Sequence, residues 1–356
     1  MKYALVIATL AIAIAPTIDA DAQWRRALPR YTYEFPRDHF AHPNFKTEWW
    51  YFTGNVESAL TGDRYGFQFT IFRQGIRPPG ERIPATSRFV IDHFHFAHLA
   101  VSDITHQNYT SEQRTTRGAF GEADATAPTV ARVEDWQIDL NEDGSFRVAA
   151  GPLDLVLRST KPPVINGIDG ASQKAAGIGN ASHYYSLTRL ATAGTIRGDP
   201  VAGTAWFDRE WGTSQLGPEQ VGWDWFALQL DDGTELMIYQ LREQDGTASP
   251  YSSGTYTDSS GAAVHLTPDQ FSLQPRASWR SESNGAVYPL EWLIAVPSLG
   301  LALRTDPAFE AQEFTHPPVA YWEGAVRVTG SHRGVGYTEL TGYAGALPGL
   351  STPPSE

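Results

Sequence analysis

The sequence contains no cysteine, and this absence removes several kinds of chemistry at once. Such a chain forms no disulfide, offers no thiol nucleophile or thiolate metal ligand, and cannot be lipidated through a cysteine. Charged residues are also few, at 19% of the chain, and the net charge is −13. Because Lys and Arg cluster no further than a pair, we expect no nucleic-acid or anionic-membrane partner.

Long hydrophobic runs are lacking as well, apart from one at the N-terminus. Residues 1–22 combine Lys2, an apolar run up to Ala15, and small residues at positions 20 and 22. This pattern is typical of a secretory signal peptide with an A-x-A cleavage site. The run is shorter than the roughly 20 residues of a transmembrane helix. We therefore expect an exported protein, periplasmic or secreted, without stable membrane insertion.

Aromatic residues are abundant and fall within short strand-like runs. They make up 12% of the chain and include 11 Trp. Alternating runs bounded by Gly, Pro, Asn and Asp recur from Trp49 to Tyr343, and no long stretch has a helical period. The sequence therefore predicts an all-β fold, with a long loop over residues 162–181. Its aromatic faces suit either a plain core or a cavity for a small apolar ligand.

The length and an internal echo predict two barrel-like domains. A chain of 356 residues usually exceeds one hydrophobic core. The aromatic run 49–52 leads through a turn into residues 65–73, and the run 223–226 leads through Asp232-Gly233 into residues 235–242. Gly accepts the positive φ of a two-residue hairpin turn. We expect a signal peptide (1–22), an N-terminal domain (23–217), a C-terminal barrel (218–346) and a flexible tail (347–356).

Two predicted strands carry groups suited to acid/base chemistry. Side chains alternate between faces, so His183 and Tyr185 share one face of the first strand. On the second strand, Trp206, Asp208 and Glu210 share a face. If both faces point inward, an imidazole and two carboxylates meet aromatic rings in one cavity. The alternative is that Glu210 pairs with Arg209 while Asp208 caps a bend.

Several motifs resemble the AttH-like secreted proteins of lipocalin fold that are related to bacterial carotenoid 1,2-hydratase. The matching stretches span nearly all of the chain after residue 22: residues 38–39, 42–43, 46–51, 181–186, 205–211, 222–225, 321–324 and 336–343. The resemblance implies two lipocalin-like antiparallel barrels in tandem. It does not define an activity, because many members of the group are labelled only as predicted secreted hydrolases.

The resemblance also implies roles for four of these residues. In the hydratase branch, a His-x-Trp strand and a Tyr-x-Asp strand supply acid/base and cation-stabilising groups. His183 and Asp208 match this pattern, whereas Tyr185 and Trp206 replace its aromatic residues with different ones. Asp208, as a carboxylic acid kept protonated by burial, would protonate an alkene, and His183 would take a proton from the attacking water.

The ligand expected from this pattern is an isoprenoid or lipid-like small molecule. Trp49, Trp50, Glu210 and the two exchanged aromatic residues are expected to contact it, and aromatic faces would stabilise a carbocation. Neither a cofactor nor a metal is required. The alternatives are a non-catalytic periplasmic carrier and a secreted hydrolase of unknown substrate, and the oligomeric state is left open.

The remaining motifs favour structural roles. His93 and His95 share a strand face and could bind a metal, but His98 lies on the other face, so core or cavity-lining roles are preferred. A Gly-x-Ser-x-Gly motif is absent, which disfavours a classical serine hydrolase. Glu48 and Glu323 could form a catalytic carboxylate pair or be buried partners of Arg73 or Arg242, and the second is preferred. Residues 336–343 are predicted to be a structural closing strand.

Overall fold

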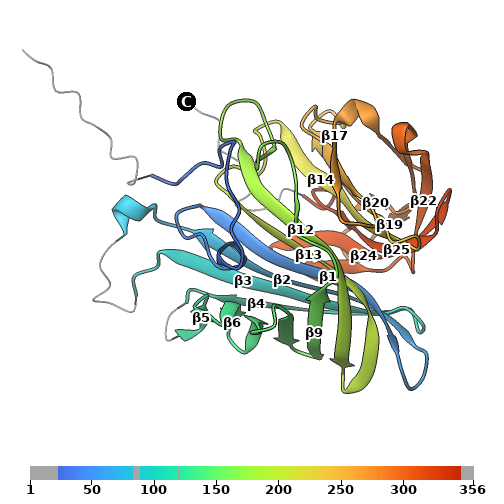
Figure 1. Ribbon diagram of the computed structural model, residues 1–356, viewed down its shortest axis with the longest axis horizontal. Coiled ribbons are helices and arrows are strands. Elements are labelled where there is room, and N and C mark those ends of the chain that lie inside the picture. The colour runs from blue at the N-terminus through green and yellow to red at the C-terminus, as the bar shows by residue number, and fades with distance from the viewer. Residues whose placement is uncertain (1–22, 83–88, 119–120, 346–356) are drawn as a thin grey trace, which may run out of the picture.

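The computed structural model describes residues 23–82, 89–118 and 121–345 (Figure 1). The predicted signal peptide (1–22) and the predicted tail (347–356) lie outside these residues, so export stays a prediction. Within the described ranges, no helix has the length and apolar character that crossing a membrane would need. The only helices described are short 3-10 turns: η2 (Arg37–His39), η3 (Pro79–Glu81), η5 (Pro268–Gln270) and η6 (Pro297–Leu299).

Thirteen strands form the first sheet, and every pairing in it is antiparallel. They are β1 (Thr47–Ser58), β2 (Arg64–Gly75), β3 (His93–Asp103), β4 (Asn108–Thr116), β5 (Ala123–Asp124), β6 (Thr129–Val133), β7 (Trp136–Leu140), β8 (Phe146–Ala150), β9 (Leu153–Ser159), β10 (Val164–Ile165), β11 (Ser172–Gln173), β12 (Ala181–Ile196) and β13 (Asp199–Gly212). The region predicted as a loop, 162–181, contains only the two-residue strands β10 and β11, which pair with β12.

Ten strands form the second sheet, which begins eight residues after β13 ends. They are β14 (Gln220–Leu230), β15 (Glu235–Glu243), β16 (Ser253–Thr257), β17 (Ala263–Leu266), β18 (Ser272–Pro275), β21 (Trp292–Val296), β22 (Leu301–Pro307), β23 (Glu313–His316), β24 (Val319–Gly330) and β25 (Gly334–Leu340). A separate two-stranded sheet pairs β19 (Ser278–Arg280) with β20 (Val287–Pro289).

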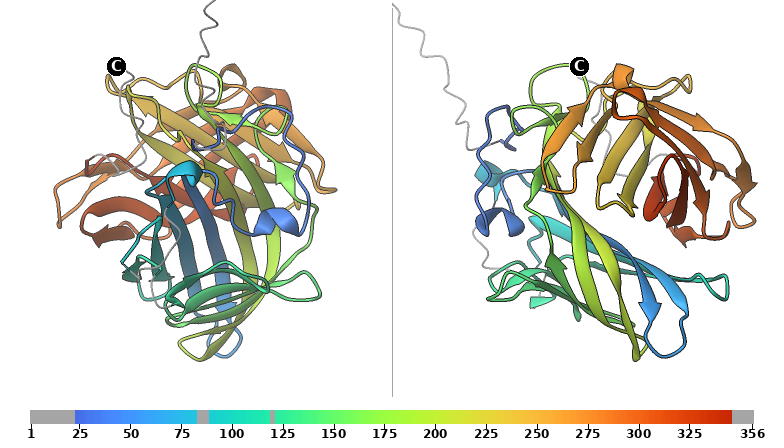
Figure 2. Two further views of the ribbon diagram at one scale, coloured as in Figure 1. Left: turned by 90° about the vertical axis from the view of Figure 1, so that its left-hand side faces the viewer. Right: turned by 45° about the vertical axis from the view of Figure 1, so that its right-hand side comes forward.

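The predicted all-β class with two barrel-like units is confirmed. The first sheet curls into a nearly closed barrel and the second into a half-barrel beside it (Figure 2). In each sheet, the first strand lies between the second strand and the last one: β1 between β2 and β13, and β14 between β15 and β25. The β14–β15 turn has Gly233 at φ +83°, which is the conformation that its Asp-Gly sequence predicts. This shared topology favours the interpretation that the two halves of the chain are an internal repeat.

Strand alternation divides the buried side chains among three clusters. Trp50, Phe52 and Phe207 belong to the core inside the first barrel. A second core, which includes Trp292, lies inside the half-barrel. Residues that point to the other face, such as Tyr51, form a third cluster that joins the outer faces of the two sheets. One face of β1 thus supports its own barrel, and the opposite face contacts the second sheet.

The interior of the first barrel is occupied by the protein's own side chains. The N-terminal segment, residues 23–46, packs Phe45 into this core and Tyr31 and Tyr33 against it. Close by, the fully buried carboxylate of Glu48 accepts hydrogen bonds from Arg73 and Arg209. Burial opposes the charge on Glu48, but the two guanidinium groups hold its pKa well below the usual range. The preferred prediction for Glu48, a buried partner of Arg73, is confirmed.

Candidate active site

A cavity of about 470 Å³ lies between the two sheets, which is within the usual size range of small-molecule sites. One wall is the outer face of the first sheet, and the other is the outer face of the second. The lining is largely aromatic: Trp49, Tyr51, Phe72, Phe94, Phe96, Tyr184, Trp223, Trp225, Tyr239 and Tyr321. We call this cavity the cleft. It also contains four acidic residues, namely Asp208, Glu210, Glu323 and Glu339.

Strand register brings the acidic residues to the cleft. On the first wall, Tyr51 of β1 is opposite Asp208 of β13, and Trp49 is opposite Glu210. Directly opposed residues of an antiparallel pair have side chains on the same face. The carboxyl groups of Asp208 and Glu210 therefore stand beside two aromatic rings, all directed toward the second sheet.

Asp208 is buried and accepts three hydrogen bonds. The Ser186 hydroxyl and the Trp206 indole N–H donate to its Oδ1, each over 2.6 Å, and the Tyr184 hydroxyl donates to its Oδ2. Burial raises the pKa of Asp208 to about 7, against the lowering effect of these hydrogen bonds, and the charge of Glu210 raises it further. Both protonation states of Asp208 are therefore populated near neutral pH.

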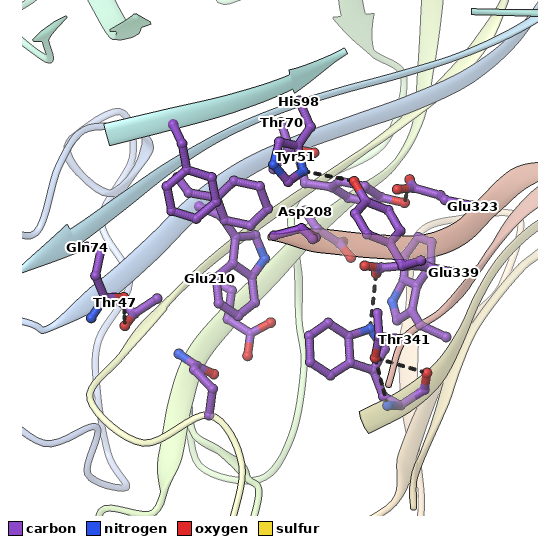
Figure 3. Close-up of a pocket in the computed structure, with 18 of the residues that line it drawn as sticks. Thr47, Tyr51, Thr70, Gln74, His98, Asp208, Glu210, Glu323, Glu339 and Thr341 are labelled. Carbon is purple, nitrogen blue, oxygen red and sulfur yellow. Dashed lines mark hydrogen bonds between the residues drawn. The ribbon is translucent and has the colours of Figure 1, made fainter. Parts of the chain in front are cut away.

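The second wall carries a carboxyl pair. Glu323 of β24 is directly opposite Glu339 of β25, so both side chains reach the cleft (Figure 3). Glu323 is buried and accepts a hydrogen bond from Tyr51 over 2.5 Å, and Glu339 accepts one from the Trp223 indole over 3.1 Å. Burial and the neighbouring Glu339 raise the pKa of Glu323 well above its usual range. Burial also raises the pKa of Glu339 to about 7, and the charge of Asp208 adds to this shift.

Glu210 forms an ion pair, although not the one considered from the sequence. Its Oε1 lies 3.1 Å from the Lys174 Nζ, whereas the guanidinium of Arg209 points to the opposite face and binds Glu48. Lys174 belongs to the loop that precedes β12 and lines the cleft. Glu210 and Trp49 were both predicted to contact a ligand, and both line the cleft. Trp206 is buried in the cluster between the sheets and holds Asp208.

The predicted meeting of His183 with Asp208 in one cavity is wrong. Asp208 is paired with Ser186 on β12, so Tyr184 and Ser186 are on the cleft side and Tyr184 lines the cleft, while His183 and Tyr185 point into the first barrel. The Nδ1 of His183 lies 2.8 Å from the Gly170 carbonyl oxygen. Burial lowers the pKa of His183 to about 4, so the imidazole is neutral.

Two further predicted ligand contacts also point into the first barrel. The hydroxyl of Tyr185 lies 2.6 Å from the Nδ1 of His39. Trp50 donates its indole N–H to the His39 carbonyl oxygen over 2.7 Å, and the guanidinium of Arg209 lies 4.0 Å from its ring centre. Because each is next to a cleft residue in sequence, strand alternation turns its side chain to the opposite face. Their roles are in packing.

The histidines of β3 divide between the two faces as predicted. His93 and His95 point inward, where the Nδ1 of His93 lies 3.0 Å from Arg73 Nη1. His98 lies on the cleft side, with its Nδ1 2.9 Å from the Tyr321 hydroxyl. Among the described residues, no group of three or more His, Cys, Asp or Glu side chains is placed to hold a metal.

The pairing of Glu323 with Glu339 was not predicted from the sequence, although one sequence pattern could have indicated it. Glu323 was expected to be a partner of Arg242, but Arg242 binds Asp224 instead. Glu339 was included in a strand considered only structural. Glu323 and Glu339 each follow an aromatic residue by two positions, as Asp208 follows Trp206. This repeated aromatic-x-acid spacing places a ring and a carboxyl on one strand face.

Comparisons with known proteins agree with this architecture. A protein from Nitrosomonas europaea assigned as AttH has a crystal structure with a TM-score of 0.80 and 36% identity, covering 90% of this chain and 99% of that one. Kievitone hydratase from Nectria haematococca has a TM-score of 0.66 at 14% identity, covering 91% and 98%, a likeness of fold alone.

One curated relative is an enzyme. Dehydratase asqC from Emericella nidulans is 28% identical over 204 residues, which are 53% of this chain. The match spans 56% of the dehydratase, so just over half of that protein's length is represented here. The family comparison covers far more, because residues 26–343 match the AttH-like family. The chain therefore belongs to the AttH-like family.

Proposed function

We propose that the cleft catalyses the addition of water to an apolar small molecule, or the reverse elimination. The observation that carries this proposal is the placement of ionisable carboxyl groups on both walls of an aromatic cavity. The pKa values of Asp208 and Glu339 are both raised to about 7. Groups with such values exchange protons most effectively near neutral pH.

In the hydration direction, protonated Asp208 transfers its proton to one alkene carbon. The ionised carboxyl of Glu339, on the opposite wall, takes a proton from water as its oxygen bonds to the other carbon. Elimination is the reverse: Asp208 removes a proton from carbon, and the Glu323–Glu339 pair protonates the departing hydroxyl. Glu339 thus has the role that the family resemblance implied for His183. The rings of Tyr51 and Trp225 line the space between the walls and suit a developing positive charge.

The relatives support this class of reaction. The match to a dehydratase covers about half of each protein and favours elimination or addition of water. A carrier of an apolar ligand, the alternative from another class, needs no carboxyl groups at the ligand. Burying several such groups opposes folding, so a purely carrying role leaves their presence unexplained.

Oxygen exchange tests the proposal without knowledge of the natural substrate. The purified protein is incubated in ¹⁸O-labelled water with geraniol, linalool and 4-hydroxy-4-phenylbutan-2-one, and the label in each alcohol is measured by mass spectrometry. Repeated elimination and addition should introduce the label. Asp208→Asn should abolish exchange while ligand affinity, measured by Trp fluorescence, stays close to that of the wild type.

His183→Gln is the matched control, because His183 lies outside the cleft, and it should retain exchange. Unchanged exchange in Asp208→Asn would exclude the proposed role of Asp208. Tight binding of these alcohols by the wild type without any exchange would favour the carrier. Native mass spectrometry of protein from its own host complements the panel, because a retained ligand would identify the molecule to test next.

A further inference from the structure

Lys174 brings a buried positive charge to the wall of the cleft. It follows β11 directly, and its side chain is 8% exposed. Its Nζ lies 3.1 Å from Glu210 Oε1, 4.3 Å from the centre of the Tyr239 ring and 5.3 Å from that of Tyr184. Among the described residues that line the cleft, Lys174 is the only Lys or Arg.

The surroundings keep this ammonium group charged. Burial alone would lower the pKa of Lys174, but the charge of Glu210 and the contact with Tyr239 outweigh it, and the pKa is raised. The ammonium has three N–H groups, of which one is directed to Glu210 and one to the Tyr239 hydroxyl. The third remains for an acceptor on a bound molecule.

Elimination that does not pass through a carbocation needs such a donor. A carboxylate whose conjugate acid has a pKa of about 7 is too weak a base to remove a proton from an unactivated C–H bond. Removal becomes feasible when the electron pair left on carbon spreads onto a neighbouring carbonyl oxygen, and a fixed cation or N–H donor stabilises the charge that develops there. The Tyr184 side chain connects the two groups involved, because its hydroxyl binds Asp208 and its ring faces Lys174.

We infer that Lys174 binds the carbonyl oxygen of the substrate, so that the cleft takes β-hydroxy carbonyl compounds and the corresponding α,β-unsaturated carbonyls. This inference rests on the proposed water addition and elimination, and it narrows the substrate class. It also changes the expected intermediate from a carbocation to an enolate.

The elimination then proceeds in two balanced steps. Asp208 takes the proton on the carbon next to the carbonyl, and the C–H electron pair forms an enolate whose oxygen accepts a hydrogen bond from Lys174. The enolate then re-forms the carbonyl, a carbon–carbon double bond forms, and the bond to the β-hydroxyl breaks. The Glu323–Glu339 pair protonates this hydroxyl, which leaves as water. Asp208 has then gained one proton and the pair has lost one, so the net charge of the enzyme is unchanged. Asp208 releases its proton to water, and the pair takes one up from water, before the next turnover.

A chromophoric enone reports the contact with Lys174 directly. The probe is trans-4-phenylbut-3-en-2-one, titrated into the full protein and followed by ultraviolet difference spectroscopy. Polarisation of its carbonyl by Lys174 should move the enone band to longer wavelength. The shift should disappear in Lys174→Met, persist in part in Lys174→Arg, and remain in Asp208→Asn.

A second variant guards against a folding defect, because Lys174→Met leaves Glu210 buried without its partner. The double variant Lys174→Met/Glu210→Gln removes both charges, and a thermal melt confirms its fold. It should also lose the shift. An independent readout is exchange of the protons next to the carbonyl of 4-phenylbutan-2-one in D₂O, followed by NMR. Lys174→Met and Asp208→Asn should each reduce this exchange at least tenfold.

Three results would overturn the inference: no binding of the enone by the wild type, binding without a spectral shift, or a shift that survives in the folded double variant. The ¹⁸O experiment decides the proposed function separately. If geraniol or linalool exchanges oxygen but the enone band does not shift, the proposed water addition and elimination would stand, and binding of a substrate carbonyl by Lys174 would be excluded. An enone shift without any oxygen exchange would preserve the Lys174 contact and exclude the water chemistry.

Discussion

Replacing Glu339 by Gln should stabilise the protein at neutral and alkaline pH and have little effect in acid. The Glu339 carboxyl is partly buried on the cleft wall, directly opposite Glu323 on the neighbouring strand. Its pKa is raised from 4.5 to about 7. Gln keeps the size of the side chain and an oxygen to accept the Trp223 hydrogen bond, but it cannot ionise.

The direction follows from proton binding. Because the pKa of Glu339 is higher in the folded state, the folded protein binds this proton more tightly than the unfolded chain. The stability it contributes is complete below pH 4.5 and is lost as the pH rises to about 7. Each pKa unit corresponds to about 1.4 kcal/mol, so ionisation costs on the order of 3 kcal/mol, and less where cleft water reaches the carboxyl. We expect Glu339→Gln to gain about 2 kcal/mol above pH 7.

Urea denaturation at acidic and at alkaline pH measures this difference. The exposed Glu57, also on a strand, provides a matched control, and Glu57→Gln should change stability equally little at both pH values. The reasoning would be refuted if Glu339→Gln had the same effect on the free energy of unfolding at both pH values, or stabilised the protein more in acid.

Three other predictions test the assignment of faces and the site. His183→Gln should leave oxygen exchange intact but lower the free energy of unfolding by about 1–2 kcal/mol, because it disrupts a buried hydrogen bond; a loss of exchange in well-folded protein would contradict this. Glu48→Gln should cost about 3–5 kcal/mol, since Arg73 and Arg209 lose their countercharge, and a thermal melt would show it. The rate of oxygen exchange should peak near pH 7, where Asp208 titrates; a flat pH profile would count against the mechanism.

The fold was largely predictable because its signals are local. Period-two alternation, turn residues and the Asp232-Gly233 pair depend on neighbouring residues, and they correctly predicted the all-β class and the β14–β15 hairpin. Glu48 could be assigned to Arg73 for a similar reason, because both flank one hairpin and face each other across it.

The site was harder because it depends on register and on docking. Alternation shows that His183 and Tyr185 share a face, but not which face of β12 meets Asp208 of β13. The observed register pairs Asp208 with Ser186, and a shift of one residue would have brought His183 to the cleft instead. The carboxyl of Glu323 comes from the other sheet, and no local pattern shows which outer faces two sheets will bury against each other.

Because the cleft lies between two sheets, a bound ligand should change how the molecule unfolds. Each half has its own hydrophobic core, so each can in principle lose its structure at its own temperature. A molecule held in the cleft contacts both halves, and its binding energy is lost when either one opens. A saturating ligand should therefore merge separate melting transitions into one, and calorimetry would detect a true ligand by this change in cooperativity even before its chemistry is known.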